Sequence, residues 1–88
     1  MNLSAQNIAF DPTELSTPAD APFQIAFANN EALPHNVEIK DASGATAFQG
    51  EIFNGVAERD YAIPPLASGT YPYLCTVHPN MTGNLTVK

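Results

Sequence analysis

The stretch YPYLCTVHPNMTG, residues 71–83, joins a strand pattern to a short loop rich in potential metal ligands. Tyr71, Tyr73 and Cys75 occupy alternate positions, so they share one face of a predicted strand. Cys75 is the only cysteine, and His78 and Met81 follow it at intervals of three residues. The stretch therefore predicts a strand that ends in a loop carrying a thiol, an imidazole and a thioether.

Alternation of apolar residues recurs along the rest of the chain, whereas no segment shows a helical period. Two strands are predicted near the N-terminus around Asp11-Pro12, where a parity slip between Leu3 and Ile8 indicates a bulge or a strand that changes sheets. Seven or eight short strands separated by turns predict an all-β, Greek-key β-sandwich, formed by one domain over residues 1–88. The remaining predicted strands lie in FQIAFAN (23–29), HNVEIK (35–40), ERDYAI (58–63) and NLTVK (84–88), and FQGEIF (48–53) is left open as a strand, a helical turn or a loop.

The same alternation places a histidine near the cysteine. His35 shares a strand face with Val37 and Ile39, so it is predicted to point inward at the start of its strand. Cys75 is predicted to point inward at the end of another strand. The start of one strand and the end of another are neighbours when the two strands pair antiparallel or lie across a sandwich. We therefore expect His35 to meet the Cys75 loop at one end of the sandwich.

Two imidazoles and one thiolate with a weak axial thioether form the coordination of a type 1 (blue) copper site. We predict one copper ion per chain, and its predicted ligands are His35, Cys75, His78 and Met81. Both histidines and the only cysteine of the chain belong to this set. A carboxylate from Glu51 is the competing axial ligand, although Glu51 is expected to face solvent, as most acidic side chains do. A sandwich that binds zinc is a further alternative: the affinity order of divalent metals puts copper above zinc, but the metal that is bound also depends on supply.

Composition excludes several other classes of function. Nine acidic and three basic residues give a net charge of −6, which argues against binding to nucleic acid or to an anionic membrane. No apolar run approaches the roughly 18–20 residues of a membrane span, and no signal peptide is expected in this sequence. No paired acids, serine triad or glycine-rich phosphate loop stands out, so we expect no enzymatic activity. One cysteine is a free thiol, an intermolecular link or a ligand.

The chain resembles the cupredoxins, the family of type 1 copper proteins. The short C-x2-H-x2-M spacing is that of amicyanin, and the resemblance to small bacterial, plastocyanin-like domains covers nearly the whole chain. It implies an eight-stranded sandwich with copper at one end, held by the four predicted ligands. It also implies that Asn36 braces the ligand loop and that backbone N–H groups point at the Cys75 sulfur. The stretches that carry the resemblance are FDPTEL (10–15), PHNVEI (34–39), GTYPYLC (69–75) and CTVHPNM (75–81).

The resemblance also implies a function. It implies transfer of one electron between redox partner proteins that dock near His78, with copper alternating between Cu(II) and Cu(I). We expect a monomer with an extracytoplasmic location, either periplasmic or on the membrane-associated exterior. Two alternatives stay open: a copper carrier or delivery module, and an electron-transfer domain excised from a larger oxidase or reductase. From loop proximity, the apolar docking patch around His78 is expected to include Leu33, Pro34, Pro79 and Phe53.

Overall fold

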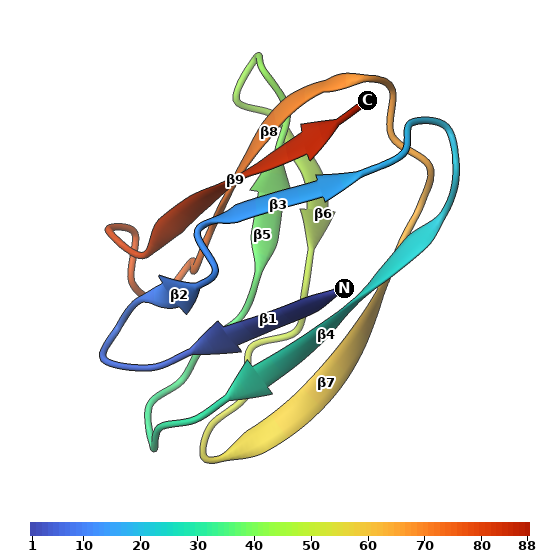
Figure 1. Cartoon of the computed structure of the whole chain (residues 1–88). Helices are drawn as coiled ribbons and strands as arrows, with labels where there is room; N and C mark the ends of the chain where they lie inside the picture. Colours follow the sequence, from blue (N-terminus) through green and yellow to red (C-terminus); the bar gives the residue numbers. More distant parts are fainter.

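Nine short strands form two mixed sheets that face each other in the computed structural model, which describes residues 1–88 (Figure 1). One sheet has the order β2-β1-β4-β7, and the other has the order β3-β9-β8-β5-β6. The structure contains no helix able to cross a membrane. This architecture confirms the predicted all-β sandwich. The strands are β1 (Asn2–Ala5), β2 (Phe10–Asp11), β3 (Glu14–Thr17), β4 (Phe23–Asn29), β5 (Glu38–Lys40), β6 (Thr46–Gln49), β7 (Ala57–Ile63), β8 (Gly69–Leu74) and β9 (Thr82–Val87).

Strand register brings four loops to one end of the sandwich. In the first sheet, Ala5 pairs with Asn29 and Asn29 pairs with Ala57, so β1 and β4 end where β7 begins. In the second sheet, Glu38 pairs with Leu74, so β5 begins where β8 ends. The β1–β2, β4–β5, β6–β7 and β8–β9 loops therefore lie together, on the left in Figure 1. We call these four loops the ligand end.

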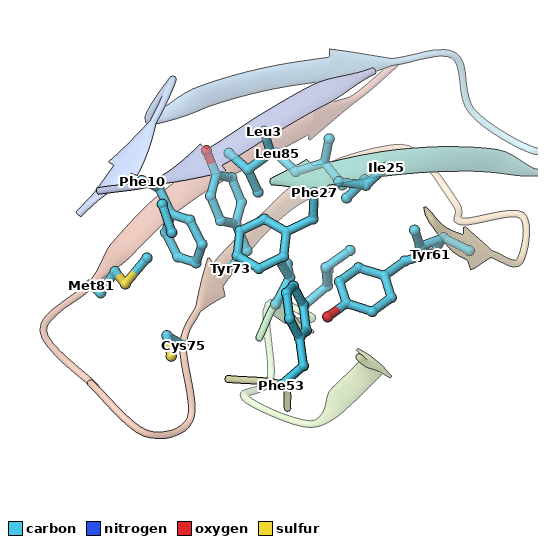
Figure 2. Close-up of a cluster of buried hydrophobic side chains, with 14 of the residues drawn as sticks. Leu3, Phe10, Ile25, Phe27, Phe53, Tyr61, Tyr73, Cys75, Met81 and Leu85 are labelled. Atoms are coloured by element: carbon cyan, nitrogen blue, oxygen red, sulfur yellow. The ribbon is translucent and has the colours of Figure 1, made fainter. Parts of the chain in front are cut away.

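Aromatic side chains fill the space between the sheets (Figure 2). The ring centroid of Phe27 lies 5.8–6.1 Å from the ring centroids of Phe10, Phe53 and Tyr61. The centroid of Phe10 in turn lies 5.1 Å from that of Tyr73. Aromatic pairs of this kind contribute about 0.5–1.5 kcal/mol each beyond burial of their surface. Phe53 is only 6% exposed and belongs to this core. The expectation that Phe53 forms part of an exposed docking patch is therefore wrong.

The predicted strand over residues 35–40 is shorter than expected. Only Glu38–Lys40 form β5, and His35 makes an isolated bridge with Phe53. His35 is buried as the alternation predicts, but Asn36 and Glu38 on the opposite face are buried as well. Both polar side chains have partners, because Asn36 bonds across two loops and Glu38 accepts a hydrogen bond from Thr46. The segment is thus enclosed on both faces.

The parity slip between Leu3 and Ile8 has a different origin from a bulge. Gln6 and Ala9 exchange two backbone hydrogen bonds of 3.0 and 3.1 Å across a two-residue turn between β1 and β2. Asn7 and Ile8 within it have φ angles of 57° and 54°, which is the backbone of a type I′ turn. The change of sheet comes later, between β2 and β3. The left-handed region costs a residue with a Cβ about 1–2 kcal/mol, so other contacts must hold this turn.

Candidate metal centre

Two loops, β4–β5 and β8–β9, bring the predicted ligands together at the ligand end. His35 lies in the β4–β5 loop, where its backbone exchanges hydrogen bonds of 3.1 and 3.2 Å with Phe53. Cys75 follows directly after β8. Because Glu38 of β5 pairs with Leu74 of β8 in antiparallel register, residues just before β5 lie beside residues just after β8. This is the neighbourhood that strand parity predicted for His35 and Cys75.

The side chains of His35, Cys75 and His78 converge on one point. Their ligand atoms all lie within 4.8 Å of one another. The Cys75 sulfur is 3.7 Å from Nδ1 of His35 and 3.8 Å from Nδ1 of His78. Cys75 and His35 are fully buried, whereas His78 is only partly buried. One imidazole is therefore enclosed in the protein, and the other lies at its surface.

These separations match those of a bound first-row metal ion. Such an ion makes bonds of about 2.0–2.1 Å to imidazole nitrogen and about 2.3 Å to thiolate sulfur. Bonds of these lengths at 120° place the sulfur and nitrogen about 3.8 Å apart, and at the tetrahedral angle about 3.6 Å apart. The observed 3.7 and 3.8 Å agree with a near-trigonal arrangement of the three atoms. The donor set and its spacing thus fit a mononuclear metal site.

The loop that carries Cys75, His78 and Met81 is closed by its own backbone. The N–H of His78 donates to the carbonyl of Cys75 (3.2 Å), and the N–H of Met81 donates to the carbonyl of His78 (2.9 Å). The N–H of Cys75 donates to the carbonyl of Met81 (3.1 Å), which completes the circuit. Each of the two turns spans three residues, which is the interval that separates Cys75, His78 and Met81. The turns therefore fix the backbone positions from which the three side chains extend.

The two candidates for the axial position differ clearly in burial. Met81 is 1% exposed and lies with Cys75 beside the aromatic core (Figure 2). The side chain of Glu51 is 72% exposed, and its carboxylate contacts the guanidinium of Arg59 at 3.4 Å. Glu51 therefore faces solvent, as expected from the sequence. The axial role of Met81 stays a prediction that its burial favours.

Asn36 connects the ligand loop to the β6–β7 loop. Its side-chain oxygen accepts hydrogen bonds from the backbone N–H (2.9 Å) and the hydroxyl (3.1 Å) of Thr76. Its amide nitrogen donates to the carbonyl of Gly50 (3.1 Å). The brace implied for Asn36 is thus confirmed. The N–H groups implied to point at the Cys75 sulfur stay a prediction.

Glu31 is a residue of the site that sequence reasoning missed. Its carboxylate lies 2.6 Å from Nε2 of His35 and accepts hydrogen bonds from the N–H groups of Asn7 and Ile8, each 2.9 Å long. The hydrogen bond from the Ile8 N–H, followed by the contact with His35, holds the pKa of Glu31 below its usual value despite partial burial. The four-residue interval from Glu31 to His35 is the only sequence signal, and it is uninformative in a loop.

A second feature lies away from this end. A shallow hollow of about 210 Å³ opens on the outer face of the β2-β1-β4-β7 sheet, and none of the four predicted ligands lines it. It is lined by Asn2, Leu3, Ser4, Asp11, Pro12, Ala26, Ala28 and Glu58.

Fold and donor set together define a small β-sandwich with a candidate mononuclear metal site at one end. A family model described as the cupredoxin-like domain matches residues 1–87. The chain belongs to the cupredoxin-like family. The resemblance drawn from the motifs is confirmed by this match.

Individual relatives agree with that assignment. The chain is 37% identical over 65 residues to amicyanin-alpha of Methylorubrum extorquens. The matched region covers 73% of this chain and 53% of that relative. It is 30% identical over 92 residues to plastocyanin of Sambucus nigra, covering 93% and 90% of the two chains. The chain spans about half the length of the amicyanins that it matches.

Solved structures show the same fold. Auracyanin A of Chloroflexus aurantiacus, described as a "blue" copper protein, matches with a TM-score of 0.88 at 23% identity, covering 100% of this chain and 97% of that one. A reduced amicyanin variant matches with a TM-score of 0.76 at 26% identity, covering 100% and 81%. The sandwich is therefore shared with copper proteins over its whole length.

Proposed function

We propose that this protein carries single electrons through one copper ion held by His35, Cys75, His78 and Met81. The observation that carries the proposal is the convergence of three ligand atoms within 4.8 Å, with a buried thiol between two imidazoles. A thiolate and a thioether suit Cu(I), and imidazole suits both oxidation states. The donor set thus serves both states of a one-electron carrier, and the comparisons with amicyanin, plastocyanin and auracyanin support it.

Copper bound in this site would supply a one-electron couple between Cu(II) and Cu(I). The chain's own contribution is to hold the ligands still and to exclude water. His35 and Cys75 are fully buried, and Asn36 fixes the loop that follows Cys75. Ligands held in one arrangement for both oxidation states move little when an electron arrives or leaves, which lowers the barrier to transfer. No bond in a substrate is made or broken, so the proposal assigns no enzymatic reaction.

Electrons are proposed to enter and leave through the exposed edge of His78. Five large apolar side chains of the molecule are exposed, and all lie in the four loops of the ligand end. Exposed apolar side chains gathered at one end of a molecule indicate an interaction surface, and a small interface suits a partner that must dissociate after each transfer. Leu33 and Pro79 of the expected patch are exposed, and Pro34 is partly exposed. The five are Ile8, Leu33, Ile52, Val56 and Val77.

The charge of the protein indicates the kind of redox partner. A net charge of −6 attracts a basic surface, and such attraction raises association rates at low ionic strength. We expect the second-order rate of electron exchange with a basic redox protein to fall as salt rises, because screening shortens the reach of the field. A rate independent of ionic strength in stopped-flow measurements would refute this steering.

Three further statements belong to the proposal. Residues 1–88 are taken as one domain, supported by a family model over residues 1–87 and by a single core cluster. The protein is taken to act as a monomer. It is taken to act outside the cytoplasm. Such compartments are oxidising, and burial and metal binding would protect Cys75 there from the oxidation that a free thiol suffers.

Addition of one equivalent of Cu(II) tests the proposal. We expect an intense thiolate-to-copper band in the visible spectrum and narrow copper hyperfine splitting in the EPR spectrum, both absent from Cys75→Ser. Met81→Ala should shift the band, whereas the matched control Glu51→Gln should leave it unchanged, because Glu51 lies in solvent beside Arg59. A colourless wild-type sample would overturn the proposal.

A competition assay separates an electron carrier from a copper delivery module. The enclosed position of Cys75 and His35 disfavours rapid release of a metal ion. We expect reduction by a small reductant to be faster than loss of copper to a chelator. Metal loss that keeps pace with electron exchange would favour delivery instead.

A further inference from the structure

The carboxylate of Glu31 is the junction between a turn and a predicted ligand. Its Oε1 accepts the N–H of Asn7 (2.9 Å), and its Oε2 accepts the N–H of Ile8 (2.9 Å) and faces Nε2 of His35 at 2.6 Å. The side chain is 17% exposed, and that of His35 is not exposed at all. Two backbone N–H groups and one ring nitrogen, from two loops, therefore converge on one carboxylate. The carboxylate lies at the opposite ring nitrogen of His35 from the one that faces Cys75.

The turn needs this carboxylate. Type I′ turns place two residues at positive φ and favour Asn-Gly, because glycine tolerates that conformation. Here the second position is Ile8, a β-branched residue for which positive φ is a strong outlier. Its N–H and that of Asn7 point the same way and end on the same side chain. Glu31 supplies the hydrogen bonds that hold both residues in the left-handed region.

Glu31 is itself fixed by its own loop. The backbone N–H of Glu31 donates to the side-chain oxygen of Asn29 (3.1 Å), and the Asn29 amide donates to the carbonyl of Leu33 (2.7 Å). Asn29 is 1% exposed, and the N–H of Asn30 donates to the carbonyl of Ala5 at 2.9 Å. The carboxylate is therefore held in place from its backbone outward, unlike a surface glutamate.

We propose that Glu31 is a positioning residue of the metal centre, which fixes the tautomer and orientation of His35 and favours the oxidised state of the bound ion. A carboxylate beside Nε2 accepts that nitrogen's proton in a hydrogen bond, so the proton stays on Nε2 and Nδ1 keeps its lone pair. Nδ1 is the atom that lies 3.7 Å from the Cys75 sulfur. A negative charge behind the imidazole also makes it a stronger donor, which stabilises the more positive oxidation state. This inference rests on the proposed function for its redox part only.

The first test uses the protein without copper and reads the His35 ring directly. Nitrogen-15 NMR of the wild-type chain should show His35 in a single Nε2–H tautomer. In Glu31→Gln the ring should populate both tautomers, because an amide presents one acceptor oxygen where the carboxylate presents two. Retention of the single tautomer in Glu31→Gln would overturn the proposal, whether or not the chain proves to be a copper protein.

The second test separates positioning from a merely structural role. Removing a hydrogen-bonded neighbour of a metal ligand typically weakens metal binding 10–100-fold. We expect Glu31→Gln to shift the Cu(II)/Cu(I) balance toward Cu(I) roughly tenfold, which corresponds to a rise of about 59 mV in the one-electron reduction potential. Glu51→Gln removes the same charge from an exposed carboxylate that does not touch His35. Its shift should be well below that of Glu31→Gln, and equal shifts would overturn the proposal.

The matched variant Ile8→Gly completes the design. Glycine keeps the backbone N–H and removes the penalty of positive φ, so it should raise thermal stability, and the potential of this single variant is the reference for the double variant. In the double variant E31Q/I8G, stability should recover while the potential stays raised. A potential that returns to the wild-type value with stability would mean that Glu31 only braces the turn. Failure of the wild-type protein to form any coloured copper site would refute the proposed function and leave the tautomer test standing.

Discussion

Replacement of Asn36 by alanine should destabilise the fold more than any other change of one polar side chain near the site. The side chain is fully buried and makes three hydrogen bonds, two with Thr76 and one with the carbonyl of Gly50. Alanine removes all three hydrogen bonds at once. The hydroxyl of Thr76 can turn toward water, but its backbone N–H and the Gly50 carbonyl are left without a protein partner.

The expected magnitude follows from those two backbone groups. Each buried group left unsatisfied costs about 1–3 kcal/mol, so we expect a loss of about 3 kcal/mol from the free energy of unfolding. A domain of this size has a total of roughly 4–13 kcal/mol. Near the midpoint, 1 kcal/mol corresponds to about 4–8 °C for a domain of 60–100 residues. Asn36→Ala should therefore lower Tm by roughly 12–24 °C.

Thermal unfolding of the copper-free protein, followed by circular dichroism, measures this effect. Asn84→Ala is the matched control, because Asn84 is exposed and only its backbone makes a hydrogen bond. The control should change Tm by less than a few degrees, as surface substitutions do. A Tm for Asn36→Ala within about 4 °C of the control, less than about 1 kcal/mol, would refute the bracing role. The loop would then be held by its own turns alone.

Three further changes test other parts of the molecule. A hydrogen bond from the Ser43 hydroxyl, above all, lowers the pKa of Asp41 below its usual 3.8. The ionised Asp41 carboxylate therefore stabilises the fold above pH 3.8, and this stabilisation is lost as pH falls through the lower pKa of the folded state. Asp41→Asn should flatten the acid side of a plot of Tm against pH. Burial raises the pKa of Tyr73 to about 12, so the free energy of unfolding should fall as pH rises from about 10 to 12. Tyr73→Phe should weaken that fall. At neutral pH the same substitution should lower the free energy of unfolding by about 1 kcal/mol, because the hydrogen bond from the Tyr73 hydroxyl to the Pro12 carbonyl is lost. Gly83→Ala should prevent stable folding, seen as loss of the unfolding transition, because a Cβ there would overlap the Tyr73 ring; a Tm near wild type would show that the ring can move.

Strand alternation predicted the part of the site that depends on sheet geometry. His35 and Cys75 meet because the start of β5 and the end of β8 are neighbours in antiparallel register, and the two-residue period places both side chains inside. The same period failed for Asn36 and Glu38, which are buried although they lie on the other face. Alternation distinguishes buried from exposed faces only where one side of a sheet meets water, and here side chains on both faces are buried.

Loop contacts were beyond the reach of the sequence for a related reason. Glu31 lies 24 positions after Asn7 and 23 after Ile8, and it belongs to a different loop from that turn. Loops have no period, so nothing in the chain links a glutamate to a turn that lacks glycine. Phe53 illustrates the same limit, because its apolar side chain in an irregular segment was equally compatible with a docking surface and with the core it occupies.

The ligand loop shows why its motif was nevertheless informative. Cys75, His78 and Met81 supply the backbone groups of a closed circuit of three hydrogen bonds, and the same residues carry the side chains predicted to bind the metal. One inserted residue would break the turns and displace a ligand at the same time, so spacing and chemistry constrain each other. The backbone bonds use none of the ligand atoms, and the protein therefore sets the shape of the loop independently of oxidation state. A frame of that kind suits a centre that gains and loses an electron without rearranging, and so the C-x2-H-x2-M spacing carries functional information that a lone cysteine or histidine does not.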